Sequence, residues 1–139
     1  MFDRLLLLED DPVTQVKMRN VLQQYVSTVS GLIIVGSMKE AEAYKDIVDF
    51  AIVDLGLPDV SSPTETANIV AQWPCPVMVM SANDDLRVAT LCGTLGMKFV
   101  PKGETMQTLH LVMANQFGLH ERVRECTGEL DKVLAAWMD

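Results

Sequence analysis

Residues 50 to 59 read FAIVDLGLPD and pass from an apolar run into a polar loop. Residues 50–53 contain no polar side chain, which is typical of a strand covered on both faces of a sheet. The run ends on Asp54, and the glycine, prolines and serines within residues 55–63 predict a loop. Ligands bind at the carboxyl ends of strands in open parallel sheets, so this pattern marks Asp54 as a candidate functional residue.

Four more runs, apolar except for Lys98 in the last, occur at residues 5–8, 32–35, 77–80 and 97–100. Amphipathic stretches separate them and predict helices over about 12–25, 38–47, 63–73 and 84–94, with a further helical pattern from 104 onward. Asp11 precedes Pro12 and is the expected N-cap of the first helix. Five apolar strands alternating with helices predict an α/β fold with a parallel sheet.

The composition fits one globular domain. The chain has 139 residues, of which 49% are hydrophobic and 22% charged, and its net charge is −8. A surface this acidic repels a phosphate backbone, so we expect no direct nucleic-acid binding. The three cysteines are widely spaced and form no CxxC pair, which indicates free thiols in a reducing compartment. The N-terminus resembles neither a signal peptide nor a membrane span, and we expect a cytoplasmic protein without a membrane partner.

Polar residues follow four of the predicted strands. Asp10 and Asp11 come after the first, Asp54 ends the third, Ser81 ends the fourth and Lys102 follows the fifth. Parallel strands end at one edge of the sheet, so these side chains should converge there. Three carboxylates at one place predict a hard divalent cation, and Mg²⁺ fits. Lys102 and Ser81 suit phosphoryl oxygens, and Asp54 is then placed as a nucleophile.

Each of these residues has an ordinary interpretation when it is taken alone. Asp10 and Asp11 could cap a helix, Asp54 could be a loop acid, Ser81 a strand-end hydroxyl and Lys102 a solvated amine. Their coincidence at one edge favours a site over these separate interpretations. Phe99 fits a plain core residue as well as a functional one.

Four segments together resemble the receiver domain of two-component response regulators. They are residues 5–11 (LLLLEDD), 52–59 (IVDLGLPD), 77–82 (VMVMSA) and 96–102 (GMKFVPK). The resemblance covers about residues 4 to 119. It implies a flavodoxin-like, doubly wound sheet of five parallel strands in the order 2-1-3-4-5, flanked by helices. An extra C-terminal helix would follow.

The resemblance also assigns roles to individual residues. It implies that Asp54 accepts a phosphoryl group and that Mg²⁺ binds Asp10, Asp11, Asp54 and the backbone carbonyl of Gly56. Ser81 and Lys102 would contact the phosphoryl group. Ser81 and Phe99 would form the switch that changes a protein-interaction surface.

The implied function is a response regulator in a two-component phosphorelay. A histidine kinase or histidine phosphotransfer protein would phosphorylate the chain, and a downstream protein would recognise it. Beyond its own phosphorylation and dephosphorylation it would not be an enzyme. A Mg²⁺-dependent phosphohydrolase is the first alternative, but such enzymes commonly carry a second acid where this chain has Gly56. The second alternative is a phosphorylation-independent scaffold or dimerisation module that acts through a C-terminal helix.

The C-terminal part suggests a boundary between a receiver domain at 1–119 and a helical extension at 120–139. Positions alternating by three and four residues form a heptad-like seam. These are Leu109, Val112, Gln116, Leu119, Val123, Cys126, Leu130, Val133 and Trp137. The seam could pack back on the domain or pair two chains as a homodimer.

Overall fold

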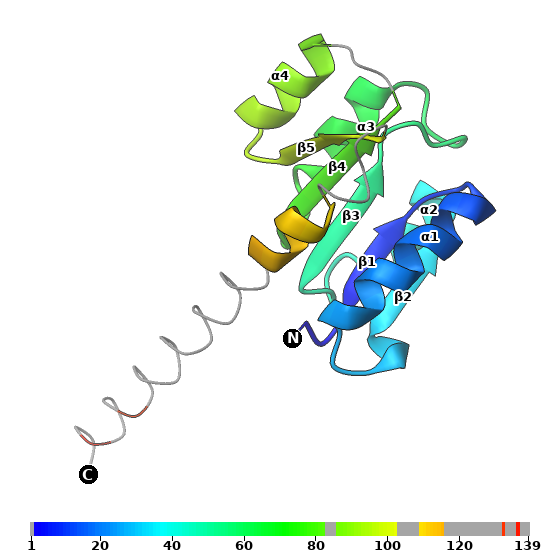
Figure 1. The fold of residues 1–139 in the computed structure, drawn as a ribbon. Coiled ribbons are helices and arrows are strands. Elements are labelled where there is room, and N and C mark those ends of the chain that lie inside the picture. The colour runs from blue at the N-terminus through cyan, green and yellow to red at the C-terminus, as the bar shows by residue number, and fades with distance from the viewer. Residues whose placement is uncertain (1, 83–85, 103–108, 116–131, 133–135, 137–139) are drawn as a thin grey trace.

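The computed structural model describes residues 2–82, 86–102, 109–115, 132 and 136. These residues contain a parallel sheet of five strands in the order β2-β1-β3-β4-β5 (Figure 1). The strands are β1 (Leu5–Leu8), β2 (Leu32–Val35), β3 (Phe50–Asp54), β4 (Val77–Ser81) and β5 (Lys98–Pro101). The predicted fold class, strand positions and strand order are therefore confirmed.

Helices cover both faces of the sheet. They are α1 (Pro12–Leu22), α2 (Met38–Ala41), α3 (Pro63–Val70) and α4 (Leu86–Thr94), with short 3-10 turns η1 (Gln23–Tyr25) and η2 (Val29–Gly31). A further helical segment comprises residues 109–115. Figure 1 shows α1 and residues 109–115, in blue and orange, on the near side of the sheet, with α2 and α3 behind it.

The sheet carries a hydrophobic core on each face because strand side chains alternate. Leu5 and Leu7 pack with Met18 of α1 and with Leu109, whereas Leu6 and Leu8 belong to the core that includes α2, α3 and α4. All four leucines of β1 are completely buried. Burying each contributes roughly 1.5–3 kcal/mol, so this central strand anchors both layers.

Local signals explain where the helices begin and end. Asp11 is the N-cap of α1, as predicted, and accepts a hydrogen bond from the Thr14 backbone N–H. Ser62 caps α3 and accepts from the N–H of Glu65, so serine and glutamate three residues apart mark this start. Gly96, just after α4, has φ +81°, a left-handed conformation that favours glycine.

The helix predicted over 38–47 is shorter in the structure. Only Met38–Ala41 is α-helical, and the residues that follow form tighter turns. The N–H groups of Ala43 and Tyr44 donate to carbonyls three residues earlier rather than four. No glycine or proline lies between residues 38 and 47, so the sequence carries no signal for this early end.

The predicted boundary at residue 119 lies outside the described residues, as does the predicted extension apart from residues 132 and 136. Two seam residues are described, Leu109 and Val112, and both are buried against the sheet. None of the helices in the described part of the chain has the length and hydrophobicity needed to cross a membrane.

Candidate functional site at the carboxyl ends of the strands

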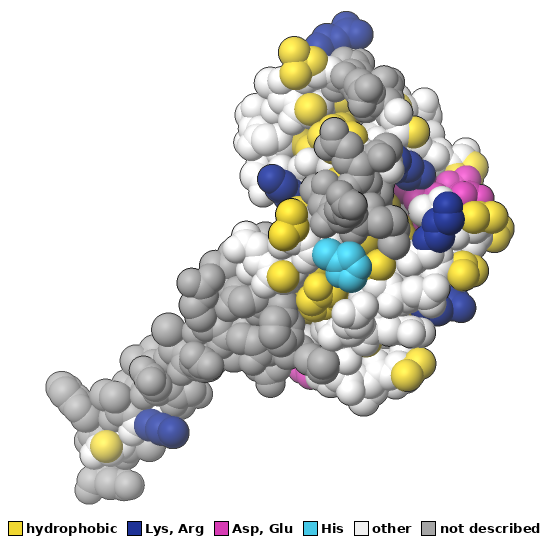
Figure 2. All heavy atoms as spheres, viewed as in Figure 1, with side chains coloured by type: hydrophobic (Ala, Val, Ile, Leu, Met, Phe, Trp, Pro, Cys, Tyr) yellow, Lys and Arg dark blue, Asp and Glu magenta, His cyan; other side chains and the backbone are white. Residues whose placement is uncertain are grey.

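The strand register brings polar side chains to one edge of the sheet. Leu8 pairs with Val53, so Glu9 lies level with Asp54 on the adjacent strand. Ser81 pairs with Pro101, which places Lys102 one residue beyond it. Glu9, Asp54 and Ser81 are 0%, 3% and 4% exposed. In Figure 2, acidic side chains lie against basic ones at the right-hand edge of the molecule.

Lys102 joins the two buried carboxylates. Its Nζ lies 2.9 Å from Asp54 Oδ2 and 3.1 Å from Glu9 Oε2. Burial lowers the pKa of Lys102, but the hydrogen bonds and attraction from Asp54 and Glu9 outweigh it and leave the pKa raised. The ammonium is therefore fully charged at neutral pH and partly neutralises two adjacent acids.

Glu9 is the most deeply buried acid of the site. Burial raises the pKa of its carboxyl, and the negative charge of Asp54 raises it further. Lys102 and the backbone N–H of Asp11, which donates to Glu9 Oε1 at 3.1 Å, oppose this rise. Glu9 Oε2 lies near the Lys102 ammonium, yet the angle gives it no hydrogen bond. One buried carboxylate oxygen is thus left without a hydrogen-bond donor.

Three acids are close enough to share a metal ion. Carboxylate oxygens of Glu9, Asp10 and Asp54 lie within 4.8 Å of one another. Oxygen-only donors suit Mg²⁺, which takes few protein carboxylates and keeps several waters. Glu9 Oε2 accepts no hydrogen bond, so it can bind a cation without losing one. The residues present therefore fit a Mg²⁺ ion.

Asp11 lies outside this group. Its Oδ2 accepts from the Thr14 hydroxyl at 2.6 Å and from the Thr14 N–H at 3.2 Å, and the residue is exposed. The hydroxyl of Thr14 is the main reason that the pKa of Asp11 is lowered. The sequence reasoning joined Asp10 with Asp11 and missed Glu9. The signal that could have found Glu9 is its position immediately after the apolar run 5–8.

Gly56 and the candidate switch residues Ser81 and Phe99 differ in their relation to the acidic group. The Gly56 N–H donates to Asp54 Oδ1 at 3.0 Å, which orients the carboxylate. Ser81 ends β4 in a buried position. Phe99 is half-buried and packs on the core that includes α3 and α4. The structure thus brings Asp10, Asp54, Ser81 and Lys102 to one edge and places Phe99 on the face next to α4.

The chain superposes on solved structures of receiver domains. The response regulator receiver domain protein (CheY-like) from Methanospirillum hungatei JF-1 superposes with a TM-score of 0.71 at 16% identity, over 88% of this chain and 98% of that one. The signal receiver domain of an HD domain-containing protein from Pseudomonas fluorescens Pf-5 gives 0.68 at 20% identity, over 88% and 99%. The BeF3-activated DrrB receiver domain gives 0.68 at 17% identity, over 84% and 97%.

No protein-family model matches the sequence, and no curated protein matches it. The likeness is therefore one of structure at low identity. The chain has the fold of a response regulator receiver domain, and the predicted resemblance is confirmed at the level of the fold.

Proposed function

We propose that this chain is a response regulator receiver domain that accepts a phosphoryl group on Asp54. The donor is a histidine kinase or a histidine phosphotransfer protein of the cytoplasm. The observation that carries the proposal is the contact of 2.9 Å between the Lys102 ammonium and the buried Asp54 carboxylate, beside two further acids. The likeness of the fold to receiver domains supports it.

The proposed reaction is a direct phosphoryl transfer. An Asp54 carboxylate oxygen attacks phosphorus and forms a P–O bond, while the P–N bond of the donor phosphohistidine breaks. The leaving imidazole nitrogen keeps the electron pair of that bond. Lys102 and the hydroxyl of Ser81 would contact the oxygens of the transferred group. Most of the catalysis is then positioning and charge stabilisation.

The acidic group supplies the metal part of this proposal. Glu9, Asp10 and Asp54, with the backbone carbonyl of Gly56, would hold Mg²⁺. The ion would contribute positive charge to the phosphoryl oxygens. Asp11 is left out because its carboxylate already accepts two hydrogen bonds from Thr14 as a helix cap.

The proposed output is a change of a protein-interaction surface. Ser81 and Phe99 lie on the neighbouring strands β4 and β5, and Phe99 is half-buried against the core next to α4. Phe99 has no hydroxyl, so its part in a switch must be a change of ring packing. A downstream protein would recognise the altered surface.

The test is the intact mass of the protein after incubation with Mg²⁺ and acetyl phosphate. We expect the wild type to gain one phosphoryl group and Asp54→Ala to gain none. Asp46→Asn is the matched control, because Asp46 is exposed and lies outside the acidic group. Labelling of Asp54→Ala equal to wild type would reject Asp54 as the acceptor. Sustained turnover of acetyl phosphate without a phosphoprotein would favour a phosphohydrolase.

A further inference from the structure

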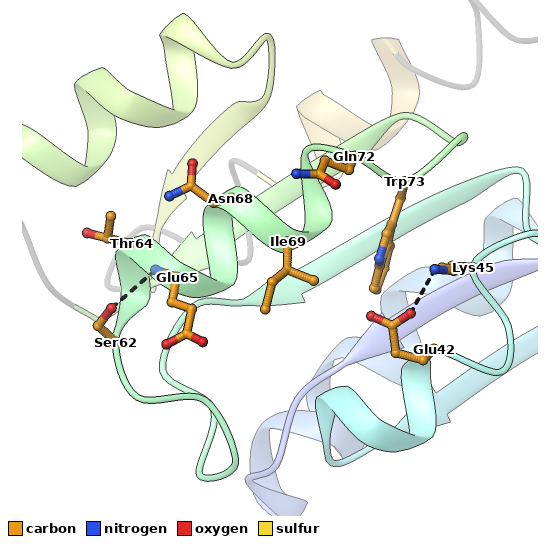
Figure 3. A pocket seen from close by; sticks show the side chains of 9 residues that line it. All are labelled: Glu42, Lys45, Ser62, Thr64, Glu65, Asn68, Ile69, Gln72 and Trp73. Carbon is orange, nitrogen blue, oxygen red and sulfur yellow. Dashed lines mark hydrogen bonds and ion pairs between the residues drawn. The ribbon is translucent and has the colours of Figure 1, made fainter.

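A cavity lies between α3 and the turns that follow α2, apart from the acidic group (Figure 3). Its volume is about 540 Å³. Protein pockets that hold small ligands occupy roughly 300–1,000 Å³, so this space admits a few residues of peptide. Ile69 and Trp73 supply apolar surface, and Glu42, Lys45 and Glu65 supply charge. None of these residues belongs to the acidic group around Asp54.

Trp73 brings an unsatisfied donor to this cavity. The residue is 7% exposed, and its Nε1 is shielded from solvent and donates no hydrogen bond to a described residue. Figure 3 shows the indole ring between Gln72 and Glu42, with its nitrogen on the edge that faces Ile69. A buried tryptophan N–H usually has an acceptor, and leaving it unpaired costs about 1–3 kcal/mol. The cavity therefore favours a ligand that supplies an acceptor oxygen.

The charge of the cavity is negative. Lys45 is already paired with Glu42 at 2.9 Å. Glu65 accepts a hydrogen bond from the Ser61 hydroxyl but forms no ion pair with a described residue. Two carboxylates against one lysine leave an excess of negative charge, which favours a cationic ligand.

We propose that this cavity binds a basic peptide segment of a partner protein. A backbone carbonyl of the peptide accepts from Trp73 Nε1, and an arginine side chain lies at the rim beside Glu65 and Glu42. Guanidinium suits carboxylates because its donors form a planar fork. A cation alone has no acceptor for the indole N–H, whereas a peptide supplies both groups. Because the nitrogen is shielded from water, the peptide must displace neighbouring side chains to reach it.

The direct test follows the indole N–H by ¹⁵N–¹H correlation spectroscopy of the full chain. The probes are acetylated and amidated tripeptides, Ala-Arg-Ala and Ala-Glu-Ala, with methylguanidinium, which carries no carbonyl, as the cation alone. Trp73→Phe identifies the resonance, because the only other tryptophan is Trp137. We expect Ala-Arg-Ala to shift the Trp73 signal at millimolar concentration and Ala-Glu-Ala to leave it unmoved. An equal shift with methylguanidinium would overturn the role of the peptide carbonyl.

Substitutions distinguish binding in this cavity from non-specific binding of a basic peptide to an acidic protein. Trp73→Phe should weaken Ala-Arg-Ala binding roughly fivefold while leaving the urea midpoint unchanged or higher, because it removes an unpaired buried donor. Glu65→Gln should weaken binding severalfold. Asp46→Asn removes one carboxylate that interacts with Lys45 but lies outside the cavity lining, and should change binding less than twofold. Equal loss in Asp46→Asn and Glu65→Gln would overturn the proposal.

The peptide site does not depend on the proposed phosphorylation. Asp54→Ala should bind Ala-Arg-Ala as the wild type does, although it cannot be phosphorylated. Loss of peptide binding in that variant would contradict an independent site. Failure of phosphorylation with intact peptide binding would reject only the function proposed for Asp54.

Discussion

Replacing Lys102 with methionine should expose how strongly the two buried acids depend on its ammonium. Methionine keeps most of the hydrocarbon stem and removes the charge. Oxygens of Glu9 and Asp54 lie within 4.8 Å, and at an effective dielectric of about 20 two charges at that distance repel by about 3.5 kcal/mol. Lys102 is a quarter exposed, so solvent screens part of this repulsion. We expect Lys102→Met to lower the free energy of unfolding by about 2–3 kcal/mol at pH 7.5.

The loss should depend on pH in a defined direction. Burial and Asp54 raise the pKa of Glu9, and Lys102 is one of the groups that restrain this rise. Without Lys102 the pKa of Glu9 rises further in the folded protein. A carboxyl with a raised folded pKa loses stability as the pH climbs from its unfolded pKa through its folded one. The difference between variant and wild type should therefore be small near pH 4.5 and complete at pH 7.5.

Urea unfolding without divalent ions measures both quantities. Lys45→Met is the matched control, because Lys45 pairs with Glu42 at a similar distance on the surface. Its loss should be much smaller than that of Lys102→Met, because an ion pair exposed to solvent contributes little. Mg²⁺ should recover part of the Lys102→Met deficit, because it binds the folded acidic group. A deficit no larger than that of Lys45→Met, or one that is the same at both pH values, would refute the reasoning.

Three more predictions test other parts of the structure. Glu9→Gln should weaken Mg²⁺ binding at least tenfold by calorimetry, whereas Asp11→Asn should change it less than threefold. A larger loss in Asp11→Asn than in Glu9→Gln would indicate that Asp11 is the metal ligand. Gly96→Ala should destabilise by about 1 kcal/mol in urea because of its positive φ, whereas Gly93→Ala, which meets no neighbouring atom, should be neutral or stabilising. Asp59→Asn should cost about 1 kcal/mol at neutral pH. The pKa of Asp59 is lowered, so the difference in unfolding free energy between wild type and Asp59→Asn should vanish as the pH falls through that pKa. A difference that stays constant down to about pH 2 would contradict this prediction.

The sheet could be predicted from sequence because its strands carry an unusually plain signal. The runs are apolar apart from Lys98 in the fifth, and a charged residue, glycine, serine or proline follows each run. The spacing of the apolar residues in α1 and its N-cap at Asp11 could be predicted equally well. The early end of α2 could not be predicted. Residues 38–47 are compatible with an α-helix and with the tighter turns that follow Ala41 in the structure.

The candidate site could be predicted as a cluster but not in every residue. Asp54, Ser81 and Lys102 lie where strand ends predict them. Three acids follow β1 in sequence, and only the register of β1 against β3 shows that Glu9, rather than Asp11, lies level with Asp54. A helix cap and a metal ligand demand the same residue type, so composition alone could not separate those two roles.

Asp59 lies in the middle of the loop that joins Asp54 to α3 and ties it to another helix. Its carboxylate accepts from the N–H groups of Met38 and Lys39, at 3.0 Å and 3.1 Å, in the first turn of α2. The loop is thus held at its ends by β3 and α3 and, between them, by α2. The hydrogen-exchange rates of the Met38 and Lys39 amides therefore report how stably the loop is held. It would register motion near Asp54 without any label placed in the loop itself.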